Sequence, residues 1–318
     1  MVTFDDVVAA QKTIAGRLHR TPLVGSAALS ERVGAPLYLK LENWQKTGSF
    51  KVRGVLNKLR TLTPAERARG LVTASAGNHA QALAWAAQAE GVPCTVVMPE
   101  SAMPAKLAAV RGYGASVVLE STVMRVIERA KALADEQGLT YIPPFDDPAI
   151  IAGAGTTGLE IVEDLPDVGT IVVGIGGGGL IAGVAVAVKT FHPRVRIIGV
   201  EPEGAPSMRR SLDVGHPVRL ESVATIADGL APPYAGAPNF EIVRQYVDDV
   251  VLVHDTAIRD AMVLILERTK LLAEPSGAAG MAALLTGAAT FDANLPVVAI
   301  ISGGNVGADR LAQLIAGV

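Results

Sequence analysis

Short apolar strands alternate with helical segments along most of this chain, and this alternation narrows the possible folds more than any other feature. Between residues 71 and 142 the pattern predicts strands near 71–74, 94–98, 115–119 and 140–142 and helices near 78–90, 104–112 and 122–137. Short strands that alternate with helices favour a parallel sheet covered by helices. This block therefore predicts a small α/β domain.

The same alternation returns after a long helix predicted at residues 147–165. Strands are expected at 170–175, 196–200, 249–253 and 296–301, and helices at 178–190, 206–213, 256–271, 275–286 and 307–316. Segments 171–173 and 297–301 are wholly apolar, as expected for strands covered on both faces. The Pro-, Gly- and Ala-rich residues 215–240 are expected to form an irregular loop.

The first part of the chain is expected to join this second block. It should hold a helix at residues 3–18, a strand at 37–42, and a helix from its N-cap Ser49 to about residue 61. We therefore predict two three-layer α/β domains with mostly parallel sheets. The large domain would comprise residues 1–62 and 147–318, and the small domain residues 63–146.

The composition limits the classes of partner. The net charge is −3 over 318 residues and no block of basic residues occurs, so we expect neither nucleic acid nor a membrane surface as a partner. The single cysteine, Cys94, excludes a disulfide within the chain. The N-terminus lacks the apolar segment of a signal peptide, and no apolar run reaches the ~18–20 residues of a membrane span. We expect a cytoplasmic protein.

Lys51 has an unusual position, in the first turn of the helix predicted after Ser49. The N-terminal end of a helix carries a partial positive charge, which disfavours a cation there. This field, together with burial, would favour the neutral amine. A neutral lysine amine is a nucleophile that can form a Schiff base with an aldehyde. A lone lysine here is more simply a surface residue, so its role depends on the rest of the chain.

Four consecutive glycines, Gly176 to Gly179, join a predicted strand to a predicted helix. They have no side chains to block a ligand, and their backbone N–H groups lie at a helix end, where an anion is favoured. No Lys-Ser/Thr pair follows them, so this is not a Walker loop, and their register does not match the dinucleotide fingerprint. The loop predicts a phosphate site.

Two further polar turns follow predicted strands, at Ser75–His79 and at Ser302–Asn305. The first offers hydroxyl, amide and backbone N–H groups suited to a carboxylate or a polar ring substituent, although Ser75 or Asn78 could instead serve only as a helix cap. Ligands of open α/β sheets bind at the carboxyl ends of strands. We therefore expect both turns, with those at Lys51 and at the glycines, to face one crevice.

Four motifs, in this order, resemble those of the fold-type-II pyridoxal-phosphate enzymes, and especially the threonine/serine dehydratases and their relative serine racemase. The motifs are Thr47–Lys51, Ser75–His79, Gly176–Leu180 and Ser302–Asn305. The resemblance spans nearly the whole chain and implies the fold of the tryptophan synthase β subunit, with a large cofactor-binding domain and a small substrate-binding domain. It implies an amino-acid substrate and a homodimer or higher homo-oligomer. Biosynthetic relatives often carry a further regulatory domain, and because this chain ends at Val318 we do not expect isoleucine feedback.

The resemblance implies a role for each motif. Lys51 would hold pyridoxal 5'-phosphate as a Schiff base and transfer the substrate's Cα proton, and Phe50 would pack against the pyridine ring. Asn78 would bind the ring's 3-hydroxyl, and Ser302 would meet the pyridine nitrogen. The backbone of Gly176, Gly177, Gly178, Gly179 and Leu180 would hold the phosphate. The substrate carboxylate would be received, mostly by backbone N–H groups, at Ser75, Ala76, Gly77, Asn78 and His79.

The implied reaction is β-elimination, in which L-threonine and/or L-serine gives a 2-oxo acid and ammonia. Racemisation needs a second base, which serine racemases typically place as a serine at the position of Ala76. Alanine cannot transfer a proton, so we favour elimination over a racemase, with another hydroxy-amino-acid lyase, such as a 3-hydroxyaspartate dehydratase, also left open. β-Replacement enzymes usually carry an SSGNTG-like turn, from which His79 departs. A non-catalytic phosphate-ligand-binding protein is a third class, but it would not need Lys51.

A divalent-cation site is a further implication of the resemblance. Related enzymes bind a cation such as Mg²⁺ or Ca²⁺ through a glutamate, a backbone carbonyl and an aspartate, and the matching residues here are Glu201, Ala205 and Ser207. Ser207 removes one charged ligand, so Glu201 could equally be a strand-end acid with another role. Asp228 and Glu274 also match family motifs and are expected to shape the site.

Overall fold

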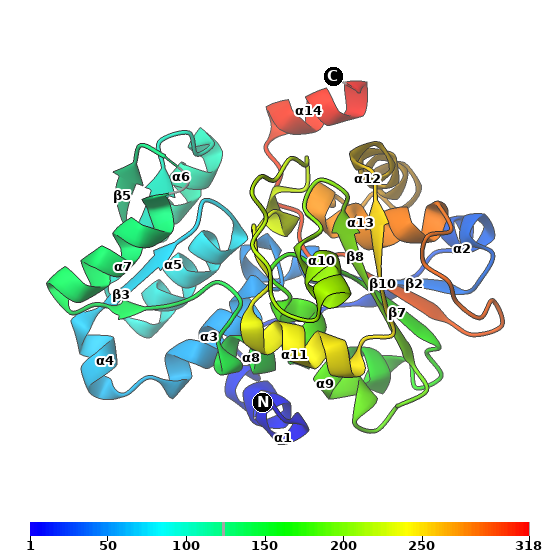
Figure 1. Cartoon of the computed structure of the whole chain (residues 1–318), viewed down its shortest axis with the longest axis horizontal. Helices are drawn as coiled ribbons and strands as arrows, with labels where there is room; N and C mark the ends of the chain where they lie inside the picture. The colour runs from blue at the N-terminus through cyan, green and yellow to red at the C-terminus, as the bar shows by residue number, and fades with distance from the viewer. Residues whose placement is uncertain (123–124, 318) are drawn as a thin grey trace.

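The computed structural model describes residues 1–122 and 125–317, which form two sheets with helices packed around them (Figure 1). The larger sheet has the strand order β1-β2-β10-β7-β8-β9 and the smaller one the order β5-β4-β3-β6. The larger sheet contains β1 (Leu23–Gly25), β2 (Leu37–Lys40), β7 (Thr170–Gly174), β8 (Arg196–Pro202), β9 (Asp249–Val253) and β10 (Val297–Ile300). The smaller contains β3 (Leu71–Ala74), β4 (Cys94–Pro99), β5 (Ser116–Glu120) and β6 (Thr140–Tyr141). Among these strands only the β1–β2 pair is antiparallel.

The helices follow the strands in the order expected for an α/β chain. Those of the first half are α1 (Phe4–Ile14), α2 (Ala27–Val33), α3 (Lys51–Thr61), α4 (Pro64–Arg69), α5 (Asn78–Glu90), α6 (Pro104–Gly112) and α7 (Val126–Gln137). Those of the second half are α8 (Pro148–Asp164), α9 (Gly179–Lys189), α10 (Ser207–Val214), α11 (Ala237–Tyr246), α12 (Asp255–Thr269), α13 (Pro275–Leu285) and α14 (Ala308–Ala316). Short 3₁₀ turns lie at Glu42–Trp44 (η1), Lys46–Gly48 (η2) and Asp228–Leu230 (η4).

The predicted α/β fold with mostly parallel sheets is confirmed. Strand β2 lies parallel to β10, with Leu37 opposite Val297. The strand predicted at residues 37–42 therefore does pair with the C-terminal block, as expected. Burial on both faces of the sheet explains why residues 171–173 of β7 are wholly apolar: Ile171 and Val173 join the core on one face, and Val172 joins the core on the other. Burying each such side chain contributes about 1.5–3 kcal/mol.

Some local predictions were wrong. Ser49 does not cap α3, because its extended backbone pairs with Gly303 and the helix starts two residues later without a side-chain cap. The segment expected to be an irregular loop as far as residue 240 already contains the start of α11, at Ala237. Strand β1 and helix α2 were not predicted. The helix expected from residue 122 is observed from Val126, and residues 123–124 lie outside the described part of the chain.

Helix α8 brings three helices into direct backbone contact. A methyl group on Gly153 would lie 2.5 Å from the carbonyl oxygen of Arg53 in α3. A methyl group on Gly155 would lie 2.7 Å from the carbonyl oxygen of Gly183 in α9. Neither position has room for a side chain, so glycine at both positions allows the backbone of α8 to lie directly against those of α3 and α9.

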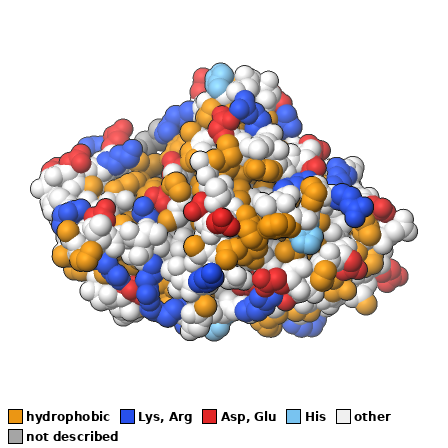
Figure 2. Space-filling model, turned by 90° about the horizontal axis from the view of Figure 1, so that it is seen from below, with side chains coloured by type: hydrophobic (Ala, Val, Ile, Leu, Met, Phe, Trp, Pro, Cys, Tyr) orange, Lys and Arg blue, Asp and Glu red, His pale blue; other side chains and the backbone are white. Residues whose placement is uncertain are grey.

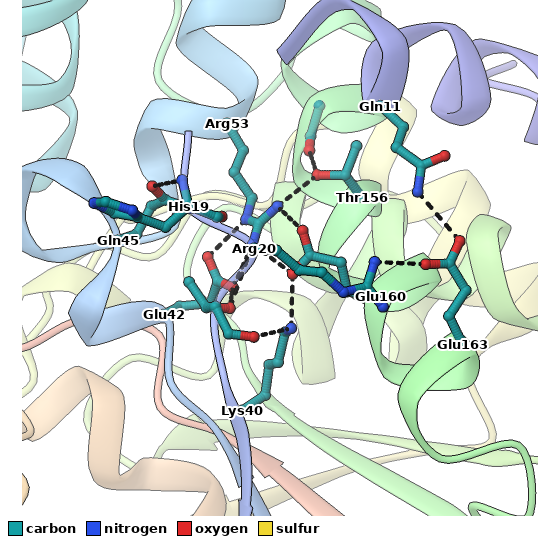
Figure 3. Close-up of polar contacts among 12 residues, drawn as sticks. Gln11, His19, Arg20, Lys40, Glu42, Gln45, Arg53, Thr156, Glu160 and Glu163 are labelled. Atoms are coloured by element: carbon teal, nitrogen blue, oxygen red, sulfur yellow. Dashed lines mark hydrogen bonds and ion pairs between the residues drawn. The ribbon is translucent and has the colours of Figure 1, made fainter. Parts of the chain in front are cut away.

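Four buried charged side chains connect β2, η1, α3 and α8 (Figure 3). The Arg53 guanidinium donates to Glu42 at 2.8 Å and to Glu160 at 2.7 Å, and the Lys40 amine donates to Glu160 at 2.6 Å. Burial acts to raise the pKa of Glu42, but attraction to Arg53 and Lys40, together with hydrogen bonds from Arg53 and Thr21, outweighs it and holds that pKa below its usual value. The two positive and two negative groups balance, which is the condition under which charges are tolerated in a protein interior.

On the face drawn in Figure 2, basic and acidic side chains lie in small mixed groups between apolar patches. None of the helices in the described part of the chain combines the length and the apolar character needed to cross a membrane.

Candidate active site

A cavity of about 460 Å³ lies at the carboxyl ends of strands from both sheets. Its walls include Lys51, the Ser75–His79 turn, the glycine loop that begins at Gly176, and Ser302. The structure thus brings together the four turns singled out in the sequence, although they span more than two hundred residues of chain.

The Lys51 amine is enclosed in this cavity at the start of α3. Its Nζ donates to the carbonyl oxygen of Pro144 at 2.9 Å and lies 5.2 Å from the centre of the Phe50 ring. Burial lowers the pKa of Lys51 to about 8, and the negative charge of Asp146 opposes this shift only in part. A carbonyl acceptor and apolar neighbours leave the amine available to a ligand once that single hydrogen bond is broken.

The glycine loop forms a cradle at the start of α9. A methyl group on Gly177 would lie 2.3 Å from the Phe145 ring, and Gly178 has a φ of +93°, which other residues rarely adopt. Asn239 holds the loop from outside, because its Nδ2 donates to the carbonyl oxygens of Gly177 at 2.7 Å and Phe145 at 3.2 Å. The N-terminus of an eleven-residue helix and free backbone N–H groups suit a phosphate.

Asn78 starts α5 and is held by two side chains from the other sheet's turns. Its Nδ2 donates to Glu274 Oε1 at 2.6 Å, and its Oδ1 accepts from Asn305 Nδ2 at 2.8 Å. Nearby, the Ser75 hydroxyl accepts a hydrogen bond from the Gly77 backbone N–H at 3.2 Å. These contacts give the turn a fixed shape at the cavity wall.

The His79 side chain is directed toward the neighbouring strands. Its Nε2 lies 3.1 Å from Thr73 Oγ1 and 3.3 Å from the carbonyl oxygen of Ile142. Burial lowers the pKa of His79 to about 3, so the ring is neutral at physiological pH. A role in the turn would therefore fall to the backbone of His79, in keeping with the prediction of backbone contacts to a carboxylate.

Ser302 lies at the opposite wall, after β10. It is 6% exposed, and its hydroxyl is 3.5 Å from the carbonyl oxygen of Ser276, a long contact that leaves it able to turn toward a ligand. A neutral hydroxyl here suits an unprotonated ring nitrogen better than a pyridinium, which would favour a carboxylate.

The carboxylate predicted to hold a divalent cation, that of Glu201, is already engaged within the protein. Both carboxylate oxygens of Glu201 already accept hydrogen bonds from the first turn of α10, from the backbone N–H groups of Met208 and Arg209 at 2.8 Å each. Ser207 donates to Glu201 Oε1 at 3.4 Å rather than supplying a charge. Within residues 1–122 and 125–317, no group of three or more His, Cys, Asp or Glu side chains is placed to hold a metal ion.

Several residues of the site carried no recognisable signal in the sequence. One is Lys106 of α6, which forms an ion pair with Asp228 of η4, a residue already expected to shape the site; both line the cavity. Tyr234 also lines it, with its ring 5.4 Å from that of Phe145. Asn239 could have been noticed only if the start of α11 had been predicted.

The family model described as "Pyridoxal-phosphate dependent enzyme" matches residues 14–303 of this chain. The chain belongs to this family. The match covers every turn that lines the cavity up to Gly303, so the family resemblance inferred from the four motifs is confirmed.

Curated relatives of this pyridoxal-phosphate-dependent enzyme resemble it over almost its full length. An L-threonine ammonia-lyase of Thermotoga maritima is 47% identical over 317 residues, which cover 99% of this chain and 78% of the relative. A catabolic L-threonine dehydratase of Escherichia coli strain K12 is 44% identical over 315 residues, which cover 98% of this chain and 96% of the relative. Among solved structures, maize serine racemase superposes with a TM-score of 0.94 at 38% identity, covering 99% of this chain and 97% of that one.

The residues of the cavity fit pyridoxal phosphate. The enclosed Lys51 amine suits its aldehyde, and the backbone N–H groups of the glycine loop, at the start of α9, suit its phosphate. Both groups lie in one cavity with apolar side chains beside the amine.

We expect the rate of cofactor uptake by the apoprotein to rise with pH up to about 8 and to level off above it, because only the neutral Lys51 amine attacks the aldehyde and its pKa is lowered to about 8. An ordinary lysine would keep gaining neutral amine, roughly tenfold per pH unit, until about pH 10. Stopped-flow absorbance over this pH range measures the rate. A rate that still rose tenfold per unit above about pH 8.5 would contradict the lowered pKa.

Proposed function

We propose that this chain is an ammonia-lyase that dehydrates and deaminates L-threonine and/or L-serine, giving a 2-oxo acid and ammonia. The observation that carries the proposal is the enclosed Lys51 amine, of lowered pKa, in one cavity with the glycine loop. The names of the relatives, L-threonine ammonia-lyase and L-threonine dehydratase, support this choice of reaction.

Each turn would have a separate task. The N–H groups of Gly176–Leu180 would hold the cofactor phosphate, Phe50 would pack on the ring, and Asn78 and Ser302 would bind ring substituents. The N–H groups of the Ser75–His79 turn, which includes Ala76 and Gly77, would receive the substrate carboxylate. These contacts would leave the substrate Cα–H and the β-hydroxyl toward Lys51.

Lys51 would then move the proton. When bound, the cofactor supplies an electron sink for the negative charge that develops at Cα. The neutral Lys51 amine removes the Cα proton and holds it as an ammonium. That proton can then reach the departing β-hydroxyl, which leaves as water, and the enamine product hydrolyses to the 2-oxo acid and ammonia.

A racemase is the second candidate, because of the 0.94 TM-score to maize serine racemase. Ala76, however, offers only a methyl group at the turn that faces the cavity, and a methyl group cannot return a proton to Cα. A 3-hydroxyaspartate dehydratase would keep the same proton transfer and differ only in the side chain that it accepts.

An assay of 2-oxo-acid release on L-threonine, L-serine, D-serine and 3-hydroxyaspartate tests the proposal. We expect release from L-threonine or L-serine to exceed that from the other two, with chiral analysis of residual L-serine showing little D-serine. Formation of D-serine as fast as pyruvate would favour the racemase. Release from hydroxyaspartate alone would favour the alternative lyase.

We also propose that residues 1–62 and 147–318 form the cofactor-binding domain and residues 63–146 the substrate-binding domain, since the larger sheet draws its strands from the first two ranges and the smaller from the third. A cytoplasmic homodimer or larger homo-oligomer is part of the same proposal.

A divalent cation at Glu201 stays a prediction, although Ser207 supplies no charged ligand there. Thermal unfolding after dialysis against EDTA, with and without Mg²⁺ or Ca²⁺, tests it.

A further inference from the structure

Three polar side chains from three separate turns form one hydrogen-bonded chain beside the cavity. Asn305 Nδ2 donates to the carbonyl oxygen of Thr47 at 2.7 Å and to Asn78 Oδ1 at 2.8 Å. Asn78 Nδ2 donates in turn to Glu274 Oε1 at 2.6 Å. These hydrogen bonds therefore link the turn before Lys51 to the turns after β3 and β10 and to the start of α13.

The order of donors and acceptors in this series of hydrogen bonds fixes the orientation of the Asn305 and Asn78 side-chain amides. A backbone carbonyl can only accept, so Thr47 requires the NH₂ group of Asn305 to face it. The same NH₂ group then requires the oxygen of Asn78 to face Asn305. Turning the Asn78 amide over would place its NH₂ against that of Asn305, an unfavourable contact at any pH. Burial raises the pKa of Glu274 to about 7, so above that pH the turned oxygen would also meet a charged carboxylate.

The first link is held by an unusual backbone. Thr47 has a φ of +66°, and a β-branched residue adopts this left-handed conformation only at a cost of order 1 kcal/mol. The following Gly48 also has a positive φ, and a methyl group on it would lie 2.4 Å from Asn305 Oδ1. The turn thus keeps its carbonyl oxygen directed at Asn305 despite the cost.

The other end is equally close-packed. Glu274 is 3% exposed, and a methyl group on Gly303 would lie 2.3 Å from its Oε1. Glycine at this position gives the carboxylate room to reach Asn78. Of the two hydrogens on Asn78 Nδ2, one is used by Glu274, and the other has no acceptor among the residues that the structure describes.

We propose that Glu274 and Asn305 are positioning residues that lock the Asn78 amide in one orientation, so that its second N–H faces an oxygen acceptor of the bound cofactor ring. The inference rests on the proposed function, because it takes the cavity to be the cofactor site. Neither residue touches the reacting atoms, and both act through Asn78. The order of their contacts explains why an asparagine, with both donor and acceptor, stands at position 78.

A double-mutant cycle tests this inference. Asn305→Asp is nearly isosteric but replaces the NH₂ donor, so Asn78 should turn over and present no N–H to the ring. We expect the dissociation constant of the cofactor, from absorbance titration of the apoprotein, to rise roughly 10- to 100-fold, the range for one hydrogen bond to a charged group. The pH midpoint of the bound cofactor's visible spectrum should shift as well. In an Asn78→Ala background, Asn305→Asp should add nothing.

Glu274 supplies a graded second cycle. Glu274→Gln keeps an acceptor for Asn78 and should stay close to wild type, whereas Glu274→Leu should match Asn305→Asp in cofactor affinity. Glu160→Gln is the matched control, because it also removes a buried charge but lies in the cluster of Figure 3 and does not contact Asn78. It should lower the unfolding midpoint without moving the spectral midpoint.

The outcomes separate the inference from the proposed function. Losses that add fully in the Asn78→Ala background, with a normal cofactor band in the wild type, would overturn the inference alone. A wild-type protein that cannot be loaded with cofactor would overturn the proposed function and the inference with it. Losses that disappear in the Asn78→Ala background, together with an unshifted spectrum in Glu160→Gln, would establish the inference.

Discussion

Replacing Lys51 with alanine is expected to lower 2-oxo-acid release by roughly 10³-fold or more and to remove the visible band of bound cofactor. The reason is that, in the proposed function, one amine would serve both as the covalent attachment and as the proton carrier. Among the described residues its hydrogen-bond acceptor is the carbonyl oxygen of Pro144. Other described lysines that line the cavity are limited to Lys106, which is paired with Asp228. Steady-state assays and absorbance spectra of the reconstituted protein measure both effects.

Lys46→Ala is the matched control, since Lys46 lies only five residues earlier but stacks over the Trp85 ring, at 5.3 Å, outside the cavity wall. It should keep the visible band and near-normal turnover. Borohydride reduction followed by peptide mass spectrometry locates the attachment. A reduced adduct on another lysine, or normal turnover in Lys51→Ala, would contradict the assignment.

The second large effect concerns stability. Arg53→Ala is expected to destabilise the apoprotein by about 3–5 kcal/mol, because Glu42 and Glu160 would be left buried without their main cation. The pKa of Glu42 is held below its unfolded value, so the charge pair contributes stability above the unfolded pKa and loses it as pH falls through the folded pKa. The difference between variant and wild type should therefore shrink under acid conditions.

Urea unfolding of the apoprotein, at neutral and acid pH, measures this difference without a contribution from ligand binding. Arg244→Ala is the control, since its pair with Glu241 is about half exposed and such pairs contribute about 0–1 kcal/mol. A loss in Arg53→Ala no larger than in this control would show that the cluster has relaxed or admitted water.

The sequence was sufficient to predict the fold class because a strand that is buried on both faces of a sheet must be apolar at every position. Segment 171–173 is wholly apolar for that reason, and the same holds for β10. Strand β1 has only three residues and forms by pairing with the edge of β2, so its own sequence contains no pattern from which a strand could be predicted. Ser49 was misread as a cap because its pairing with Gly303, more than two hundred residues away, competes with local capping.

The same distinction applies to the site. The turns at Lys51 and Gly177 were recognisable because each is an unusual local pattern. Glu274 and the Ser302–Asn305 turn were also singled out, but their pairing with Asn78 was not, because Glu274 lies 196 residues and Asn305 227 residues further along the chain. Which donor meets which acceptor is decided only when the two sheets are placed together. His79 shows the converse: a polar residue in a recognised motif whose ring faces the protein interior.

The glycine contacts of α8 have a consequence for which ligands the site admits. Lys51 begins α3 and the glycine loop leads into α9, and α8 joins these two helices backbone to backbone at Gly153 and Gly155. These backbone contacts leave little room for a change in the spacing of the two helices. The scaffold therefore fixes the distance between Lys51 and the glycine loop. If this loop holds the cofactor phosphate, we expect an analogue whose phosphate arm is longer by one methylene to reach the amine or the loop, but not both.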